Sequence, residues 1–217
     1  MNRRELFLSV LMVVMFVVGF VGHSLEATLP WMMALTPYFL FVFGTLAILP
    51  VLLERNVSFY VWSAAVLAVT FFLEAAGTAT GRIFGPYTYG GSLGPKLLEV
   101  PVVIAFNWVL VILGALILAR LITGNRLAAA FLGAVLAAGF DFLLEPAAMR
   151  LDYWNWTGVA TPAGIPVQNY AAWFLIALAA GLPFSLLRIP AKSRVPMAYF
   201  LIQAVYFAAL RLFAPRF

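Results

Sequence analysis

Long apolar stretches dominate the chain, and short segments between them carry most of the charged, proline and glycine residues. A helix that crosses a bilayer needs ~20 consecutive, mostly apolar residues. The stretches that meet this requirement are Glu5–Gly22, Pro30–Leu53, Phe59–Gly81, Leu97–Leu121, Leu127–Pro146, Val167–Leu187 and Val195–Phe213. A bilayer offers no water to the backbone, so each span must satisfy its own hydrogen bonds as a helix. The pattern therefore predicts an all-α, polytopic transmembrane helical bundle with about seven spans.

The composition agrees with this interpretation and leaves no room for a soluble domain. Of 217 residues, 65% are hydrophobic and only 10% are charged, and the mean hydropathy is +1.05. Soluble domains carry roughly a quarter charged residues. We expect residues 1–217 to form a single integral-membrane domain. No small-x-small cleavage site follows the first apolar run, which is therefore interpreted as a retained first span rather than a signal peptide.

Several kinds of chemistry are excluded by what the sequence lacks. There is no cysteine, so disulfides, thiolate metal sites and cysteine nucleophiles are ruled out. His23 is the single histidine, which rules out a multi-histidine metal site. We expect no metal and no cofactor. The net charge of +5 comes from basic residues at the ends of the predicted spans, as membrane topology requires, so no nucleic-acid partner is expected.

The basic residues also predict an orientation. The side of the N-terminus holds eight, namely Arg3, Arg4, Arg55, Arg120, Arg126, Arg188, Lys192 and Arg194. The opposite side holds five, namely Arg82, Lys96, Arg150, Arg211 and Arg216. The excess predicts a multi-pass protein of the cell membrane with a cytoplasmic N-terminus. The two longest connections, Arg82–Lys96 and Ala147–Pro166, then lie together on the far side.

Three carboxyl groups fall inside predicted spans, where an ionisable side chain costs a few kcal/mol or more and is a functional candidate. At 1.5 Å per residue, Glu74 lies ~9 Å inside the end of the third span and Asp141 ~8 Å inside the end of the fifth. Asp141 and Glu145 are four residues apart and so project from one helix face. If the third and fifth helices are neighbours, all three carboxyls meet at one level.

Two less specific explanations stay open. Each carboxylate can pair with Arg82 or Arg150 and simply hold two helices together. Gly77 and Gly81 form a small-xxx-small pair that admits another helix or a flat ligand. In the functional alternative, burial in an apolar wall favours the neutral form of a carboxyl group, which is then able to donate a proton.

Several runs in order resemble the membrane carotenoid-biosynthesis protein family, which includes carotenoid 1,2-hydratases of the CruF type and bisanhydrobacterioruberin hydratases. The similarity extends from about Glu74 to Trp173, nearly half the chain. It is carried by Glu74–Tyr89 (EAAGTATGRIFGPYTY), Leu93–Pro101 (LGPKLLEVP), Asp141–Pro146 (DFLLEP), Trp154–Trp156 (WNW), Gly164–Asn169 (GIPVQN) and Trp173.

The resemblance implies cofactor-free addition of water to the terminal C1=C2 bond of an acyclic carotenoid end group, of the lycopene, γ-carotene or bisanhydrobacterioruberin type. The substrate would lie within the bilayer among lipids. We expect Asp141 to donate the proton and Glu74 to orient water, with Glu145 beside them, although the roles of Asp141 and Glu74 can be reversed. The expected substrate-binding residues are Tyr87, Tyr89, Trp108, Trp154, Trp156, Asn169 and Trp173, whose aromatic members can face a carbocation with their π-systems.

The sequence also bears on other classes of protein. A retinal protein needs a lysine within a late span, but Lys96 and Lys192 lie in or beside connections. A prenyl transferase needs aspartate-rich motifs, and the chain has only Asp141 and Asp152. A carotenoid cyclase shares the protonated intermediate, and a non-catalytic carotenoid-binding or transport protein can also hold intramembrane carboxyls. The last two alternatives remain open, as does the oligomeric state.

Overall fold

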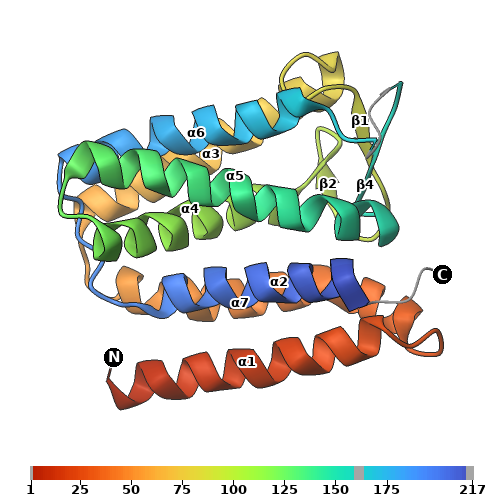
Figure 1. The fold of residues 1–217 in the computed structure, drawn as a ribbon, viewed down its shortest axis with the longest axis horizontal. Coiled ribbons are helices and arrows are strands. Elements are labelled where there is room, and N and C mark those ends of the chain that lie inside the picture. Colours follow the sequence, from red (N-terminus) through yellow and green to blue (C-terminus); the bar gives the residue numbers. More distant parts are fainter. Residues whose placement is uncertain (1, 159–163, 214–217) are drawn as a thin grey trace.

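The computed structural model describes residues 2–158 and 164–213 and contains, within them, seven helices that lie side by side as a bundle (Figure 1). The helices are α1 (Arg3–His23), α2 (Leu29–Leu52), α3 (Val57–Thr80), α4 (Val102–Ile122), α5 (Arg126–Arg150), α6 (Val167–Leu186) and α7 (Val195–Phe213). Each is long and apolar enough to cross a membrane. The prediction of an all-α bundle with about seven spans is confirmed.

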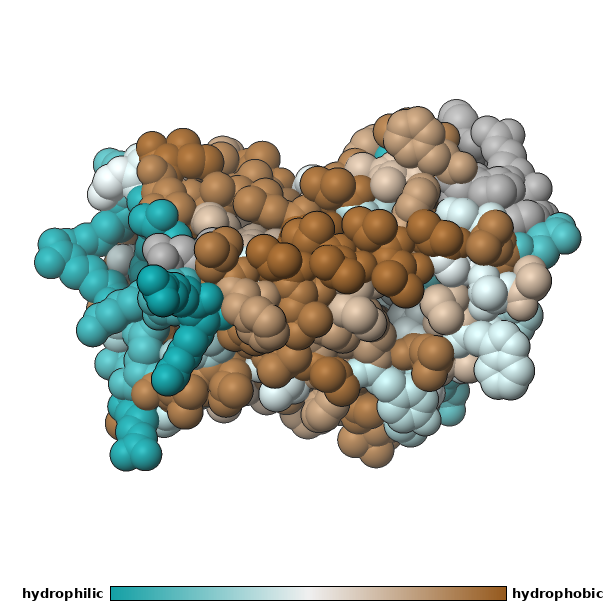
Figure 2. Space-filling model, turned by 90° about the horizontal axis from the view of Figure 1, so that it is seen from below, coloured by the Kyte–Doolittle hydropathy of each residue, from teal (hydrophilic) through white to brown (hydrophobic). Residues whose placement is uncertain are grey.

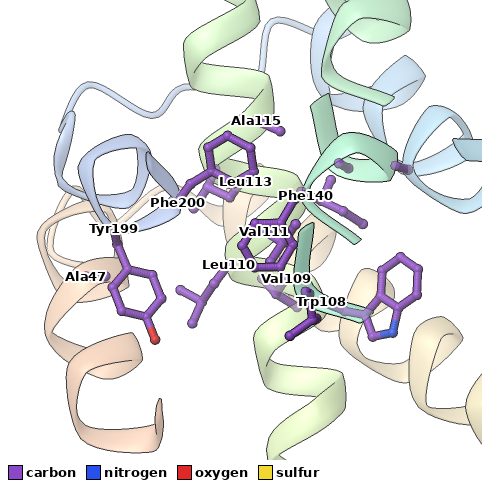
Figure 3. Close-up of a cluster of buried hydrophobic side chains, with 14 of the residues drawn as sticks. Ala47, Trp108, Val109, Leu110, Val111, Leu113, Ala115, Phe140, Tyr199 and Phe200 are labelled. Carbon is purple, nitrogen blue, oxygen red and sulfur yellow. The ribbon is translucent and has the colours of Figure 1, made fainter. Parts of the chain in front are cut away.

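Helix α4 lies at the centre of the bundle, and most of it is buried. It packs against α3, α5 and α7, with α2 also in contact, whereas α1 lies at one edge against α7 and α2 (Figure 1). Around α4 the interior is filled by apolar side chains such as Leu110, Leu113, Phe140 and Phe200 (Figure 3). This centre fixes the positions of α3, α5 and α6, the helices that carry the three intramembrane carboxyls and their nearest partners.

The outer surface is that of a protein immersed in hydrocarbon. Large apolar side chains are exposed along the helices, for example Phe7 at 67% and Phe72 at 63%. In Figure 2 apolar residues cover the middle of one face, and hydrophilic residues gather at one end. A water-soluble protein would not expose so much apolar surface. The chain is therefore a multi-pass membrane protein.

Short strands occur in the connections between the helices. Helix α4 begins at Val102 rather than at Leu97, because β2 (Lys96–Leu97) and β3 (Val100–Pro101) pair as a tight hairpin. The two residues between them, Leu98 and Glu99, both have positive φ angles, of 50° and 64°. Positive φ at both central positions is the requirement of a type I′ turn.

Helix α5 passes through Pro146 and ends at Arg150, four residues later than predicted. Proline has no N–H, so the carbonyl of Phe142, one turn earlier, loses its helical partner. The guanidinium of Arg211 donates to that carbonyl at 3.0 Å and lies 4.5 Å from the centre of the Phe142 ring. A side chain from α7 thus replaces the missing bond. The longer helix also places Asp141 ~14 Å from its end instead of ~8 Å.

Candidate functional site

The two long connections meet in a short antiparallel ladder at one end of the bundle (Figure 1). Strand β1 (Tyr87–Tyr89) pairs with β4 (Trp154–Trp156), so that Tyr87 lies opposite Trp156 and Tyr89 opposite Trp154. Alternate residues of a strand project to the same face. Two tyrosines and two tryptophans therefore point together into the bundle, while the central residue of each strand is exposed.

The tyrosines of the ladder hold the carboxyl group of Glu74. Tyr87 and Tyr89 both donate their hydroxyl to Oε2 of Glu74, the latter at 2.8 Å, and the indole N–H of Trp108 in α4 donates to Oε1 at 2.7 Å. Glu74 is only 5% exposed. Burial is the largest cause, and the charge of Glu74 the second, that raises the pKa values of Tyr87 and Tyr89 above the usual value of tyrosine. Both phenols therefore remain protonated donors at ordinary pH.

The tryptophans of the ladder hold Glu145 in the same way. Trp154 and Trp156 donate their indole N–H groups to Oε2 of Glu145 at 3.0 and 2.8 Å. The side-chain nitrogen of Asn169 in α6 donates to Oε1 at 3.0 Å. Glu145 therefore accepts from three donors, as Glu74 does, and hydrogen bonds of this kind suit an ionised carboxylate.

Asp141 is held differently. The same Asn169 nitrogen donates to its Oδ2 at 2.6 Å, so one amide bridges Asp141 and Glu145. Its other oxygen, Oδ1, has no hydrogen-bond partner among the described residues, although the side chain is fully buried. A neutral carboxyl group carries one O–H donor in addition to its acceptor oxygen. The arrangement leaves room for that proton on Oδ1.

These groups surround a small cavity of about 40 Å³. This space is enough to hold water and too small for a branched hydrocarbon end group. The indole rings of Trp108 and Trp173 close one wall, stacked 3.6 Å apart at 18°. The lining residues are Glu74, Phe84, Tyr87, Tyr89, Ile104, Asn107, Trp108, Asp141, Leu144, Glu145, Trp154, Trp156, Asn169 and Trp173.

All ten residues proposed from the sequence lie in this one lining. The carboxyls do not pair with arginine, which was one of the less specific explanations. Within residues 2–158 and 164–213 their hydrogen-bond donors are tyrosine, tryptophan and asparagine. Gly77 does not receive a neighbouring helix: the ring of Phe84 packs on it, and a Cβ there would lie 2.7 Å from that ring. Gly81 ends α3 with a φ of 66°.

The sequence analysis missed four lining residues. Phe84, Ile104 and Leu144 are apolar side chains like many others in the chain, and nothing in the sequence distinguishes them. Asn107, a polar residue within a predicted span, had a visible signal. The period-2 alternation of Tyr87–Tyr89 and Trp154–Trp156 was a second available signal, because it is typical of strands that present one face.

Comparisons with known proteins identify a family and a relative. The family described as "Carotenoid biosynthesis protein" matches residues 35–214. The bisanhydrobacterioruberin hydratase of Haloarcula japonica is 33% identical over 169 residues, which cover 70% of this chain and 55% of that protein. The chain therefore matches little more than half the length of this curated relative. No solved structure matches the chain.

Proposed function

The chain belongs to the carotenoid biosynthesis protein family, and from this premise we propose that it is a hydratase that adds water across the terminal C1=C2 bond of an acyclic carotenoid end group. The relative from Haloarcula japonica is named for a bisanhydrobacterioruberin substrate. End groups of the lycopene and γ-carotene type have the same reacting bond and are the other candidate substrates. The reaction needs an acid, a water molecule and a wall that tolerates a cation.

One observation carries the proposal: buried Asp141, whose Oδ1 has no hydrogen-bond partner among the described residues, lines a small cavity together with two carboxyls that other groups already hold. Glu74 and Glu145 each accept three hydrogen bonds and are poor candidates for the acid. Asp141 accepts one. Its Oδ1 is the atom from which a proton can be given without breaking an existing hydrogen bond.

The reaction then balances as follows. The π electrons of the C1=C2 bond take the proton from Asp141 Oδ1, which forms the C2–H bond, leaves Asp141 as a carboxylate and places the positive charge on the tertiary C1. The oxygen of water forms a bond to C1 and loses one proton. That proton passes to the cluster and restores the acid on Asp141, so one tertiary alcohol forms and no other reactant is consumed. Glu74, which lines the same cavity, orients the water.

The walls suit the cation. Faces of Trp and Tyr rings attract positive charge, and the two flanking carboxylates add a favourable field. Five aromatic side chains expected to bind the substrate converge here from the ladder and α6, namely Tyr87, Tyr89, Trp154, Trp156 and Trp173. Because the empty cavity is too small for the end group, side chains of the wall must move when the substrate enters, and the rest of the polyene would lie between helices in the bilayer.

The test is to express the chain in bacterial hosts that accumulate lycopene, γ-carotene or a C50 precursor, and to analyse the extracted pigments by chromatography and mass spectrometry. We expect a product heavier by one water, or by two where both ends react. A product of unchanged mass and altered retention would replace hydration by cyclisation. Unchanged pigment from all three substrates, with the protein present and folded in the membrane, would contradict catalysis and favour the binding or transport alternative.

The orientation is part of the same proposal. The N-terminus and the connections α2–α3, α4–α5 and α6–α7 lie at the end of the bundle opposite the ladder (Figure 1). Among the described residues that end carries eight basic residues against four for the other, so we place it in the cytoplasm and the site near the opposite face. The orientation can be tested by introducing single cysteines at Gly124 or Gly91 into this cysteine-free chain and labelling intact cells with an impermeant reagent. Only the cysteine at position 91 should react.

A further inference from the structure

A second polar pocket lies at the end of the bundle remote from the ladder. It has a volume of about 300 Å³ and is formed where α4 ends, α5 begins and α6 ends. Its lining residues are Arg120, Thr123, Gly124, Asn125, Arg126, Ala129, Ser185, Arg188, Ile189 and Pro190. Three arginines face one pocket, and no carboxylate pairs with any of them within the described parts of the chain.

Capping of helix α6 accounts for part of this positive charge. Arg120 donates to the carbonyls of Phe184 and Ile189, and its guanidinium lies 3.9 Å from the centre of the Phe184 ring. Arg126 makes one longer bond, of 3.3 Å, to the carbonyl of Leu186. Cations at the C-terminal end of a helix are favourable for this reason. Capping leaves most of the five N–H donors of Arg126 unused.

Arg188 is not explained by capping. Its side chain is exposed, lines the pocket and makes no hydrogen bond to any described residue. Its φ is 53°, the left-handed conformation that follows many helices and that glycine adopts without strain. An arginine at this position costs backbone energy that glycine would not, and it adds a third positive charge beside two others.

A buried polar atom points independently to a ligand. Ser185 is 3% exposed and lines the pocket, and its hydroxyl has no hydrogen-bond partner among the described residues. An unsatisfied buried hydroxyl is unfavourable, since it has lost its water without gaining a bond. An oxyanion in the pocket would accept this hydroxyl hydrogen together with guanidinium N–H groups. The N-terminus of α5, at Asn125 and Arg126, adds the positive end of a helix dipole.

We propose that this pocket binds a phosphate group, and that its natural source is the headgroup of a phospholipid. Bidentate arginine recognition suits the geometry of a phosphate. The volume of the pocket exceeds that of a single phosphate and leaves space for the glycerol of a lipid. Exposed apolar residues lie close in sequence to the lining residues at the ends of α4 and α6 and the start of α5, namely Leu121, Ile122, Leu127, Leu186 and Leu187, so acyl chains can lie against the bundle. Basic pockets between transmembrane helices recognise lipid headgroups elsewhere. This inference does not depend on the proposed hydratase activity.

The test uses the purified full chain in a maltoside detergent and follows its thermal unfolding. Three probes are titrated at constant ionic strength: dioleoyl phosphatidylglycerol, dioleoylglycerol and inorganic phosphate. We expect phosphatidylglycerol to raise the unfolding temperature and dioleoylglycerol to have no such effect. A rise with inorganic phosphate alone, of equal midpoint, would identify the ligand as free phosphate. Equal effects of the two lipids, or no effect of either phosphate probe, would overturn the proposal.

Variants separate binding from capping. Arg188→Gly removes one guanidinium and relieves the left-handed backbone, so the ligand-free protein should not lose stability, whereas the midpoint for phosphatidylglycerol should rise about tenfold. Arg55→Gly is the matched control: Arg55 is exposed at the same end, has a φ of 52° and lies outside the pocket. It should leave the midpoint unchanged. Ser185→Ala should weaken binding without destabilising the ligand-free protein. Unchanged midpoints in both pocket variants would overturn the proposal and leave Arg120 and Arg126 with the capping of α6 alone.

Discussion

Replacement of Asp141 by asparagine tests the assignment of the acid directly. The amide keeps the shape of the side chain and still offers Asn169 an oxygen, so the 2.6 Å bond of the wild-type protein has a counterpart. What changes is the atom at the position of Oδ1, which becomes an NH₂ group that cannot give up a proton. That atom has no hydrogen-bond partner among the described residues, so no other bond is broken by the change.

The expected loss of activity is much larger than the expected loss of stability. A positioned general acid contributes about 10²- to 10⁴-fold to a rate, so hydration should fall by at least about a hundredfold, or ~3 kcal/mol in the barrier. The cost in stability should be about 1 kcal/mol or less, because water in the 40 Å³ cavity can accept from the new amide. The loss should thus fall on catalysis and spare folding.

The assay compares pigment conversion per amount of folded protein in membranes, with thermal unfolding in detergent as the control for structure. Asp152→Asn is the matched variant: Asp152, the chain's only other aspartate, is exposed in the following connection, and its left-handed φ of 52° is one that asparagine tolerates. It should convert pigment as the wild type does. Conversion by the Asp141 variant within about threefold of wild type, far short of the expected loss, would refute the reasoning and move the acid to another group.

Three further predictions concern the supports of the site. Asn169→Leu should lower conversion by about tenfold to a hundredfold, because both neighbouring carboxyls lose their shared donor; normal conversion would show that the amide is dispensable. Gly77→Ala should lower the free energy of unfolding by about 1–3 kcal/mol through overpacking, whereas Gly139→Ala, with open space at its Cβ, should raise it by about 0.5–1 kcal/mol; thermal unfolding checks both. Arg211→Met should destabilise the protein by about 1 kcal/mol, and less in a Pro146→Ala background; strict additivity in that double-mutant cycle would contradict the backbone role of the arginine.

The helices were predictable because a bilayer span imposes one length and one composition. The ends of the helices were less predictable, and the reason differs between α5 and α4. Pro146 looks like a terminator in the sequence, but α5 continues because a guanidinium from α7 reaches the carbonyl that the proline leaves free. The start of α4 was placed too early because the apolar character of Leu97 and Leu98 hides a hairpin with two left-handed residues. Both depend on contacts or dihedral angles that hydropathy does not report.

The three carboxyls of the candidate site were predictable from charge and spacing, and its other members followed from the family resemblance, but the hydrogen bonds among them were not predictable. A separation of four residues is enough to place Asp141 and Glu145 on one face of a helix, and both line the cavity. No spacing rule tells which carboxyl Tyr87 or Trp154 will reach, because this depends on the register of a ladder formed by connections far apart in the sequence. The aromatic residues, expected as a wall for the cation, also prove to be hydrogen-bond donors.

The hydrogen bonds distinguish three carboxyls that are buried to a similar extent. An indole N–H can donate a hydrogen bond but cannot accept one. The carboxyl oxygens that face Trp108 on Glu74, and Trp154 and Trp156 on Glu145, must therefore be acceptors. Asp141 receives no indole at all. A proton added to the cluster meets the fewest hydrogen-bond donors at Asp141. This difference between Asp141 and the two glutamates does not depend on depth in the membrane. In the proposed reaction, the positions of the tryptophans therefore determine which carboxyl serves as the acid, and moving an indole should move that role.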